Sequence, residues 1–90
     1  MYYLFVNRTK PGADGEALSR VMPAHIEWVR EHSRSGAIAQ AGKWGDIGGM
    51  MVFRGDDEAA VRTLAETDPL VASGLIDWDL APFYPVRDIY

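Results

Sequence analysis

The sequence predicts an α+β domain with the element order β-α-β-β-α-β. Short runs rich in aromatic and β-branched residues alternate with two stretches of helical periodicity. The chain has 90 residues, which fits one domain, and we expect a single domain over residues 1–90. It has no cysteine, so packing rather than disulfide bonds must hold it together.

The first half of the chain supplies a strand and a long helix. Residues 2–7 are rich in aromatic and β-branched side chains and predict a strand, and its two alternating sets, residues 2, 4, 6 and 3, 5, are apolar, which predicts cover on both faces. A turn over 9–15 leads to a helix over about 16–35, where apolar residues recur at helical spacing. Gly36 suits the end of this helix. Pro23 predicts either a kink or the start of the main helical segment.

The second half supplies the remaining elements. In chain order we expect a strand over 37–44, a hairpin connection over 45–48, a strand over 49–54, a helix over 57–66, a further helical turn over 70–74 and a strand over 75–84. Gly42 and its alanine neighbours predict a close approach on one face of the second strand. Pro82 and Pro85 indicate that the last strand ends at or near a sheet edge. This order is the ferredoxin-like arrangement, a four-stranded antiparallel sheet with two helices on one face.

The sheet face without helices needs a partner. The third strand, like the first, is apolar on both sides, and the fold covers only one side. We therefore expect a homodimer that packs sheet against sheet through the open face. Residues 86–90 end in apolar and aromatic side chains and are expected to add to an interface.

Composition excludes several classes of function. Nine basic residues against 13 acidic ones give a net charge of −4, and the basic residues form no stripe, so no nucleic-acid partner is expected. No apolar run approaches the roughly 20 residues of a membrane span. Residues 1–6 lack the length and the basic flank of a signal peptide. We therefore expect no membrane association and a cytoplasmic location.

His25 is the first candidate for chemistry. It lies on the apolar face of the predicted helix, and a histidine pKa of about 6.5 suits a general base or a ligand near neutral pH. The alternative is a core histidine with a satisfied hydrogen bond. His32 lies on the same face of this helix, seven residues and about 10.5 Å beyond His25. This spacing is poor for two histidines that share one metal ion. We interpret His32 as a cation near the helix C-terminus, and no metal is expected.

Asp68 is the second candidate. It precedes Pro69, a pairing typical of a helix N-cap. The alternative is a carboxylate that orients a histidine and stabilises its charged form, if helix packing brings it near His25. Asp77 and Asp79 are interpreted as a solvated strand face, with acid–base catalysis by paired carboxylates as the alternative.

Other candidate features are weaker. We interpret three tryptophans as core or interface residues: Trp28, Trp44 and Trp78. The glycines match no phosphate-binding pattern, and no cofactor is expected.

The ordered set of these residues resembles a known family. Pro23-Ala24-His25, Gly36 after the helix, Ala41-Gly42, Asp68-Pro69-Leu70-Val71 and Gly74-Leu75 resemble the YciI-like proteins, which carry a YCII-related domain. The resemblance covers nearly the whole chain. It implies a dimeric α+β barrel fold and an active-site pair that maps onto His25 and Asp68.

Two positions depart from the family pattern. Members often carry an arginine shortly before the histidine, where this chain has Met22, and a proline after Ala-Gly, where this chain has Lys43. Whether Arg20 or Lys43 replaces that arginine is left open. If the arginine holds an anionic substrate in other members, this departure bears on the substrate class.

Three hypotheses for function follow. The first is a cofactor-independent lyase or isomerase, or a dehydrochlorinase-like enzyme by resemblance to one branch of the family. In it His25 acts as general base on a small-molecule ligand, Asp68 orients it, and Phe5, Trp28 and Met50 line the pocket. The second is a non-catalytic ligand-binding or structural dimer, in which the pair only ties a helix to a loop. The third, by analogy with fold relatives, is a haem site with His25 as axial ligand.

Overall fold

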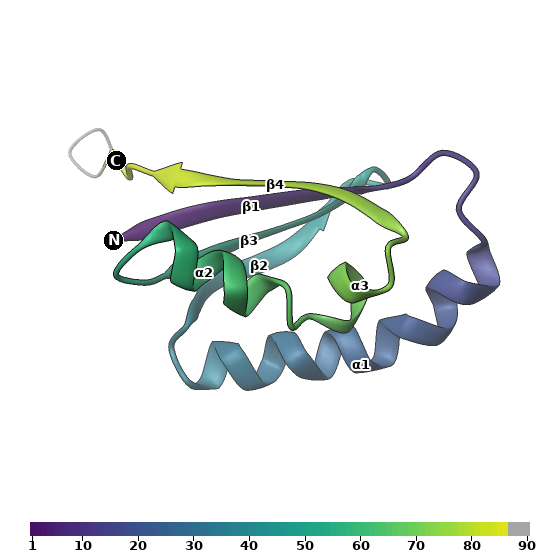
Figure 1. The fold of residues 1–90 in the computed structure, drawn as a ribbon, viewed down its shortest axis with the longest axis horizontal. Coiled ribbons are helices and arrows are strands. Elements are labelled where there is room, and N and C mark those ends of the chain that lie inside the picture. Colours follow the sequence, from purple (N-terminus) through teal and green to yellow (C-terminus); the bar gives the residue numbers. More distant parts are fainter. Residues whose placement is uncertain (87–90) are drawn as a thin grey trace.

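A four-stranded antiparallel sheet in the order β2-β3-β1-β4 is the centre of the structure, a computed structural model that describes residues 1–86. The elements follow one another as β1 (Tyr2–Thr9), α1 (Gly15–Arg34), β2 (Ile38–Trp44), β3 (Gly48–Arg54), α2 (Glu58–Ala65), α3 (Pro69–Ala72) and β4 (Ile76–Phe83). All three helices lie on one side of the sheet (Figure 1). The predicted fold class is confirmed, with α3 in the region of the expected helical turn.

Helix α1 is continuous through Pro23. It begins after Asp14, whose carboxylate accepts a hydrogen bond from the Glu16 amide at 3.0 Å. Gly36, just beyond its end, has a φ of +89°, a left-handed conformation that suits glycine. Pro23 lies inside the helix and does not begin it. In Figure 1 the N-terminal part of α1 turns away from the line of the longer part that follows, as expected for a helix that contains proline.

The core lies between the sheet and the helices. Successive strand residues point to opposite faces, so Tyr3 and Phe5 of β1 face the helices. The buried apolar residues of this layer are Tyr3, Phe5, Trp28, Ile38, Met51, Phe53, Val61, Ala65, Leu70, Ile76 and Leu80. The pair Phe5–Phe53 meets edge to face, with ring centroids 6.2 Å apart.

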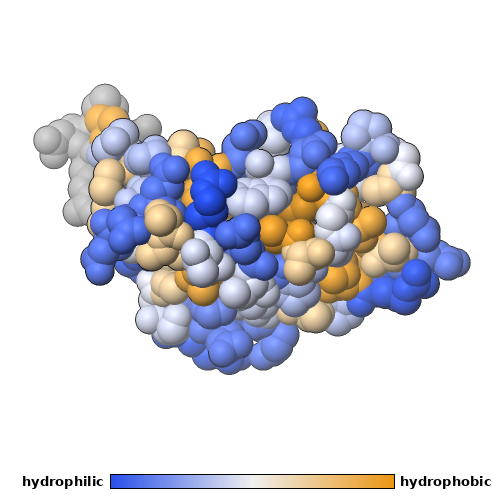
Figure 2. Space-filling model, in the orientation of Figure 1, coloured by the Kyte–Doolittle hydropathy of each residue, from blue (hydrophilic) through white to orange (hydrophobic). Residues whose placement is uncertain are grey.

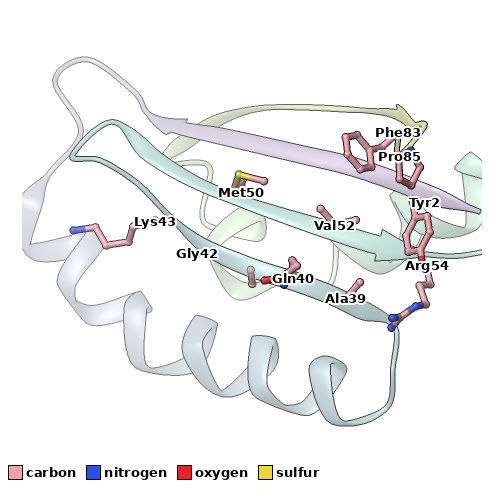
Figure 3. A pocket seen from close by; sticks show the side chains of 11 residues that line it. Tyr2, Ala39, Gln40, Gly42, Lys43, Met50, Val52, Arg54, Phe83 and Pro85 are labelled. Atoms are coloured by element: carbon pink, nitrogen blue, oxygen red, sulfur yellow. The ribbon is translucent and has the colours of Figure 1, made fainter. Parts of the chain in front are cut away.

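The other face of the sheet carries no helix. Leu4 and Val6 point to this open face, and Met50 is exposed on it. A hollow of about 640 Å³ lies over it, with Tyr2, Val52 and Phe83 among its lining residues (Figure 3). The predicted interface role of the C-terminal tail concerns residues 87–90, which lie outside the described part of the chain, and Val86, which is exposed.

Two local features differ from the sequence-based expectation. Strand β1 runs on to Thr9 because Arg8 and Thr9 pair with Asp77 and Ile76 of β4. The close backbone approach lies on β3 at Gly48 instead of Gly42. A Cβ at Gly48 would collide with the backbone of Asn7, whereas Gly42 has open space on its side-chain side.

Within the described residues, no helix combines the length and the apolar character needed to cross a membrane.

Candidate active site

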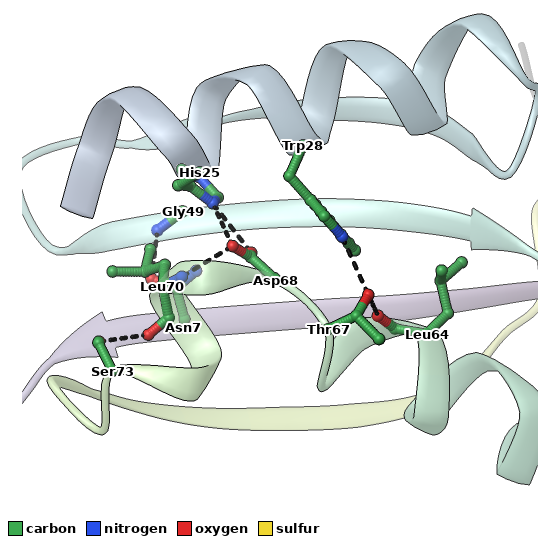
Figure 4. Close-up of polar contacts among 9 residues, drawn as sticks. All are labelled: Asn7, His25, Trp28, Gly49, Leu64, Thr67, Asp68, Leu70 and Ser73. Atoms are coloured by element: carbon green, nitrogen blue, oxygen red, sulfur yellow. Dashed lines mark hydrogen bonds and ion pairs between the residues drawn. The ribbon is translucent and has the colours of Figure 1, made fainter.

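His25 of α1 and Asp68 at the start of α3 meet in the helical layer. The Nδ1 atom of His25 lies 2.9 Å from each carboxylate oxygen of Asp68 (Figure 4). The aspartate side chain is 1% exposed and the histidine side chain 15%. A buried carboxylate thus holds one edge of an imidazole ring that is still open to solvent.

The local sequence around Asp68 fixes the carboxylate. Asp68 is the N-cap of α3, its Oδ1 accepts a hydrogen bond from the Leu70 amide at 2.9 Å, and Pro69 occupies the first helical turn. Both interpretations of Asp68 offered by the sequence therefore describe real contacts. The same carboxylate caps a helix and contacts His25.

The geometry selects one tautomer of the imidazole. An ionised carboxylate only accepts hydrogen bonds, so the Nδ1 of His25 donates to Asp68 and carries the proton. In the neutral ring the lone pair then lies on Nε2. The contact leaves Nε2 as the nitrogen that can accept a proton or bind a ligand.

A second contact joins the same elements one turn along α1. The indole Nε1 of Trp28 donates to the Thr67 hydroxyl at 3.0 Å, and that hydroxyl donates to the Leu64 carbonyl at 2.6 Å (Figure 4). Sequence reasoning did not identify Thr67. The available signal was Trp28, because a buried indole N–H needs an acceptor.

A cavity of about 630 Å³ lies beside His25, between α1 and the β2–β3 side of the sheet. Its apolar wall includes Leu18, Met22, Val29, Met51, Leu70 and Ile76, and its polar lining includes Asn7, Thr9, Arg30, Lys43 and Asp46. Figure 2 shows apolar side chains gathered on this side of the molecule around α3. Such a cavity, apolar with a few polar groups, is typical of small-molecule sites.

The structure separates the three residues expected to line the pocket. Met50 borders the cavity, but strand alternation turns its side chain to the open face of the sheet, where it is exposed. Phe5 lies in the core with 0% exposure and stacks on Trp78 at 5.3 Å between ring centroids. Trp28 is also buried in the core, and its ring contacts that of Phe53. Alternation along β1 places Phe5 on the correct face, but the helices cover it completely.

The cations of the cavity come from β2 and α1. Lys43 lines it and lies 3.9 Å from Asp46, while both side chains stay exposed. Arg20 is not a lining residue and pairs with Glu16 at 3.7 Å. Of the two residues weighed from the sequence, Lys43 is the one at the cavity. Arg30, which sequence reasoning missed, also lines it.

The other ionisable candidates lie elsewhere. His32 is in the last turn of α1 and packs against the Trp28 ring at 4.6 Å. Asp77 and Asp79 are exposed on the open face of the sheet, away from the His25–Asp68 pair. Within residues 1–86 there is no group of three or more His, Cys, Asp or Glu side chains placed to hold a metal ion.

The chain belongs to the YCII-related domain family, whose family model matches residues 1–83. No curated protein sequence matches it.

Solved structures show the same fold. One is the 5-chloro-2-hydroxyhydroquinone dehydrochlorinase TftG from Burkholderia phenoliruptrix AC1100, solved in complex with 2,5-dihydroxybenzoquinone. It has a TM-score of 0.73 and 18% sequence identity, and the match covers 93% of this chain and 94% of the TftG chain. Muconolactone isomerase has a TM-score of 0.75 and 13% sequence identity, and the match covers 96% of this chain and 91% of the isomerase chain. An antibiotic biosynthesis monooxygenase has a TM-score of 0.56 and 13% sequence identity, and the match covers 94% of this chain and 100% of the monooxygenase chain. These likenesses, all at 18% identity or less, show that the fold is shared.

Proposed function

We propose that this protein is a cofactor-independent enzyme that removes a proton from a small molecule, with His25 as general base and Asp68 as its orienting carboxylate. The observation that carries the proposal is the contact of the His25 Nδ1 with both oxygens of buried Asp68 at 2.9 Å, beside a cavity of about 630 Å³. A base oriented by a third group is a recurring arrangement in enzymes.

The chemistry starts from the neutral imidazole. Asp68 holds the proton on Nδ1, so Nε2 accepts a proton from the bound substrate. The imidazolium that forms is stabilised by the adjacent carboxylate. For an isomerase or lyase, the proton then returns to another position of the substrate or leaves with the product.

The structural neighbours support a reaction of this kind. A dehydrochlorinase removes hydrogen chloride from its substrate and an isomerase of a lactone relocates bonds within one molecule. Both outcomes can begin with a base. The cavity wall is apolar and carries Lys43 and Arg30, which favours a small ring compound with an oxygen or carboxylate substituent.

We also propose that a second copy of the chain covers the open sheet face. The support is the apolar character of that face, where Leu4, Val6 and Val52 form a stripe across the two central strands. Exposed Met50 and Phe83 extend this stripe. Apolar surface of this kind on a small domain is typical of an interface. The expected cytoplasmic location and the absence of a nucleic-acid partner stay predictions.

A structural role for the pair is the second candidate. It is favoured by the hydrogen bond from the Leu70 amide to Asp68, which makes the aspartate a helix cap whatever else it does. A haem site is a third candidate, because a histidine with Nδ1 bound to a carboxylate also has the form of an axial ligand. The visible spectrum of the purified protein tests it, since bound haem gives a Soret band.

The deciding experiment compares His25→Ala with His32→Ala, a histidine on the same helix outside the cavity. Turnover is screened with small phenols, quinones and lactones. We expect His25→Ala to lose about 10²–10⁴-fold in turnover and His32→Ala to keep it. A folded His25→Ala protein with unchanged turnover would refute the base. A lower melting temperature with retained ligand affinity would favour the structural role.

A further inference from the structure

Asn7 is a buried polar residue that the proposed proton transfer leaves unexplained. It lies on β1, on the face shared with the apolar core residues Tyr3 and Phe5, and is 7% exposed. In the described part of the chain, Asn7 and Asp68 are the two buried residues with polar or charged side chains. Burying an amide costs free energy unless its polar atoms are bonded, so the contacts of Asn7 need an explanation.

The amide of Asn7 has a fixed orientation. Its Oδ1 accepts a hydrogen bond from the backbone amide of Gly49 at 3.2 Å (Figure 4). An amide nitrogen cannot accept from an N–H, so the oxygen must face Gly49 and the NH₂ group must face elsewhere. Gly49 lies opposite Asn7 in the strand pairing, and it has no side chain to cover that group.

The NH₂ group of Asn7 keeps some access to solvent. Among the hydrogen bonds within residues 1–86, Nδ2 donates to no protein acceptor. Every fully buried side-chain N or O atom in that range has a hydrogen-bond partner. Because Nδ2 has none, it is not fully buried. Both Asn7 and His25 line the same cavity. Asn7 is therefore placed to direct its two amide hydrogens into the cavity that His25 also lines.

We propose that Asn7 is a substrate-binding residue of this cavity, whose Nδ2 donates a hydrogen bond to an oxygen of the substrate. The inference rests on the proposed function and names its substrate class, a small ring compound in which the acidic C–H lies next to a carbonyl group. When Nε2 of His25 takes the proton, the C–H electron pair forms a C=C bond. The carbonyl π electrons move to oxygen, and Asn7 stabilises the resulting oxyanion.

The wall around Asn7 strengthens this donor. Met51, Leu70 and Ile76 contribute apolar surface to the same cavity, and a hydrogen bond to a charged oxygen gains strength in surroundings of low dielectric constant. Lys43 and Arg30 line the cavity as exposed cations. Each lies beside a carboxylate, Lys43 beside Asp46 and Arg30 beside Glu27, so the buried amide of Asn7 selects the position of the oxygen.

The test is a binding measurement with two probes that differ in one group. 4-Nitrophenolate presents an oxyanion on an aromatic ring, and nitrobenzene is the same ring without it. Titration calorimetry measures both with the full chain and with two variants. Asn7→Asp keeps an oxygen for the Gly49 amide but removes the NH₂ donor, and Asn7→Leu removes both groups without adding a charge.

We expect both variants to bind 4-nitrophenolate roughly 10–100-fold more weakly, as for loss of a hydrogen bond to a charged group. Nitrobenzene affinity should stay unchanged, which a damaged fold would not allow. Equal weakening of both probes, or a loss confined to Asn7→Asp from charge repulsion, overturns the proposal. Binding needs no turnover, so these outcomes are independent of whether His25 acts as a base.

Discussion

On the face of the sheet that the helices cover, Phe5 and Phe53 are fully buried, whereas on the opposite face Met50 and Phe83 remain exposed. The two faces come from the same strands and are both apolar on β1 and β3. The covered face has the whole core and the His25–Asp68 pair. Within residues 1–86 no helix covers the open face, and the proposed second copy is what would bury its apolar surface.

This difference separates two kinds of stability. Burial under the helices contributes to folding of a single chain, whatever the protein concentration. In the proposed dimer, burial of the open face by a second copy contributes by mass action and grows with concentration. Successive residues of β1 point alternately to the covered face and to the open face. A substitution on one face can therefore be compared with one at the neighbouring residue on the other face.

The largest expected effect is that of Phe5→Ala compared with Leu4→Ala. Phe5 is 0% exposed among the core rings, and truncating such a side chain costs about 3–5 kcal/mol. Leu4 is half-buried on the open face. Urea unfolding at two protein concentrations should show a large, concentration-independent loss for Phe5→Ala. It should show a smaller loss for Leu4→Ala that changes with concentration. Equal behaviour of the two would refute the distinction.

The next prediction is that Leu4→Glu weakens the dimer by about 100-fold or more, because burying an unpaired charge at an interface is costly. Analytical ultracentrifugation measures the dissociation constant directly. Ile26→Glu is the matched control, since Ile26 is an exposed apolar residue of α1 on the helical side. A Leu4→Glu protein as dimeric as the parent would show that the open face is not the interface.

A smaller effect is expected at the buried carboxylate of the covered face. Asp68→Ala removes the cap oxygen for the Leu70 amide and the partner of His25, which should cost about 1–3 kcal/mol. Asp68→Asn retains an oxygen that can accept from Leu70 and should lose less. Thermal unfolding gives the difference as roughly 4–8 °C per kcal/mol. Equal losses would mean that the cap oxygen contributes nothing.

The smallest effect concerns Tyr3 at alkaline pH. Burial raises the pKa of its phenol above the ordinary 10.0, and the carboxylates of Asp57 and Glu58 act in the same direction. The folded protein holds this proton more tightly than the unfolded chain. Its contribution to stability is therefore complete below about pH 10 and lost as the pH rises through the folded-state pKa.

Urea unfolding across alkaline pH checks this expectation for Tyr3. The Tyr3→Phe variant should lose less stability than the parent protein as the pH rises, because it has no phenol to ionise. Identical pH profiles for the two proteins would contradict the raised pKa.

Sequence patterns predicted the elements because β1 is rich in aromatic and β-branched residues and each of the two longer helices has a cap. Asp57 and Asp14 lie where the structure has N-caps. Helix periodicity placed His25 on the apolar face, and only the family resemblance favoured Asp68 as its partner. No local pattern could reveal that contact alone, because its partners lie 43 residues apart.

The pocket residues were harder to predict because alternation gives the face of a strand but not its cover. Phe5 and Asn7 share a face of β1, yet the core seals Phe5 while the cavity reaches Asn7. The role of Asn7 depends on its pairing with Gly49. That register is a property of the folded sheet and is not readable from either residue.

The single carboxylate of Asp68 ties two processes together. It accepts from the Leu70 amide and contacts the His25 ring at the same time. Any transient opening of the first turn of α3 that displaces the carboxylate therefore also releases the imidazole. Hydrogen exchange at the Leu70 amide would then follow the same fluctuation as the loss of orientation of His25. That one amide proton is a native reporter of the site, readable by NMR before any substrate is known.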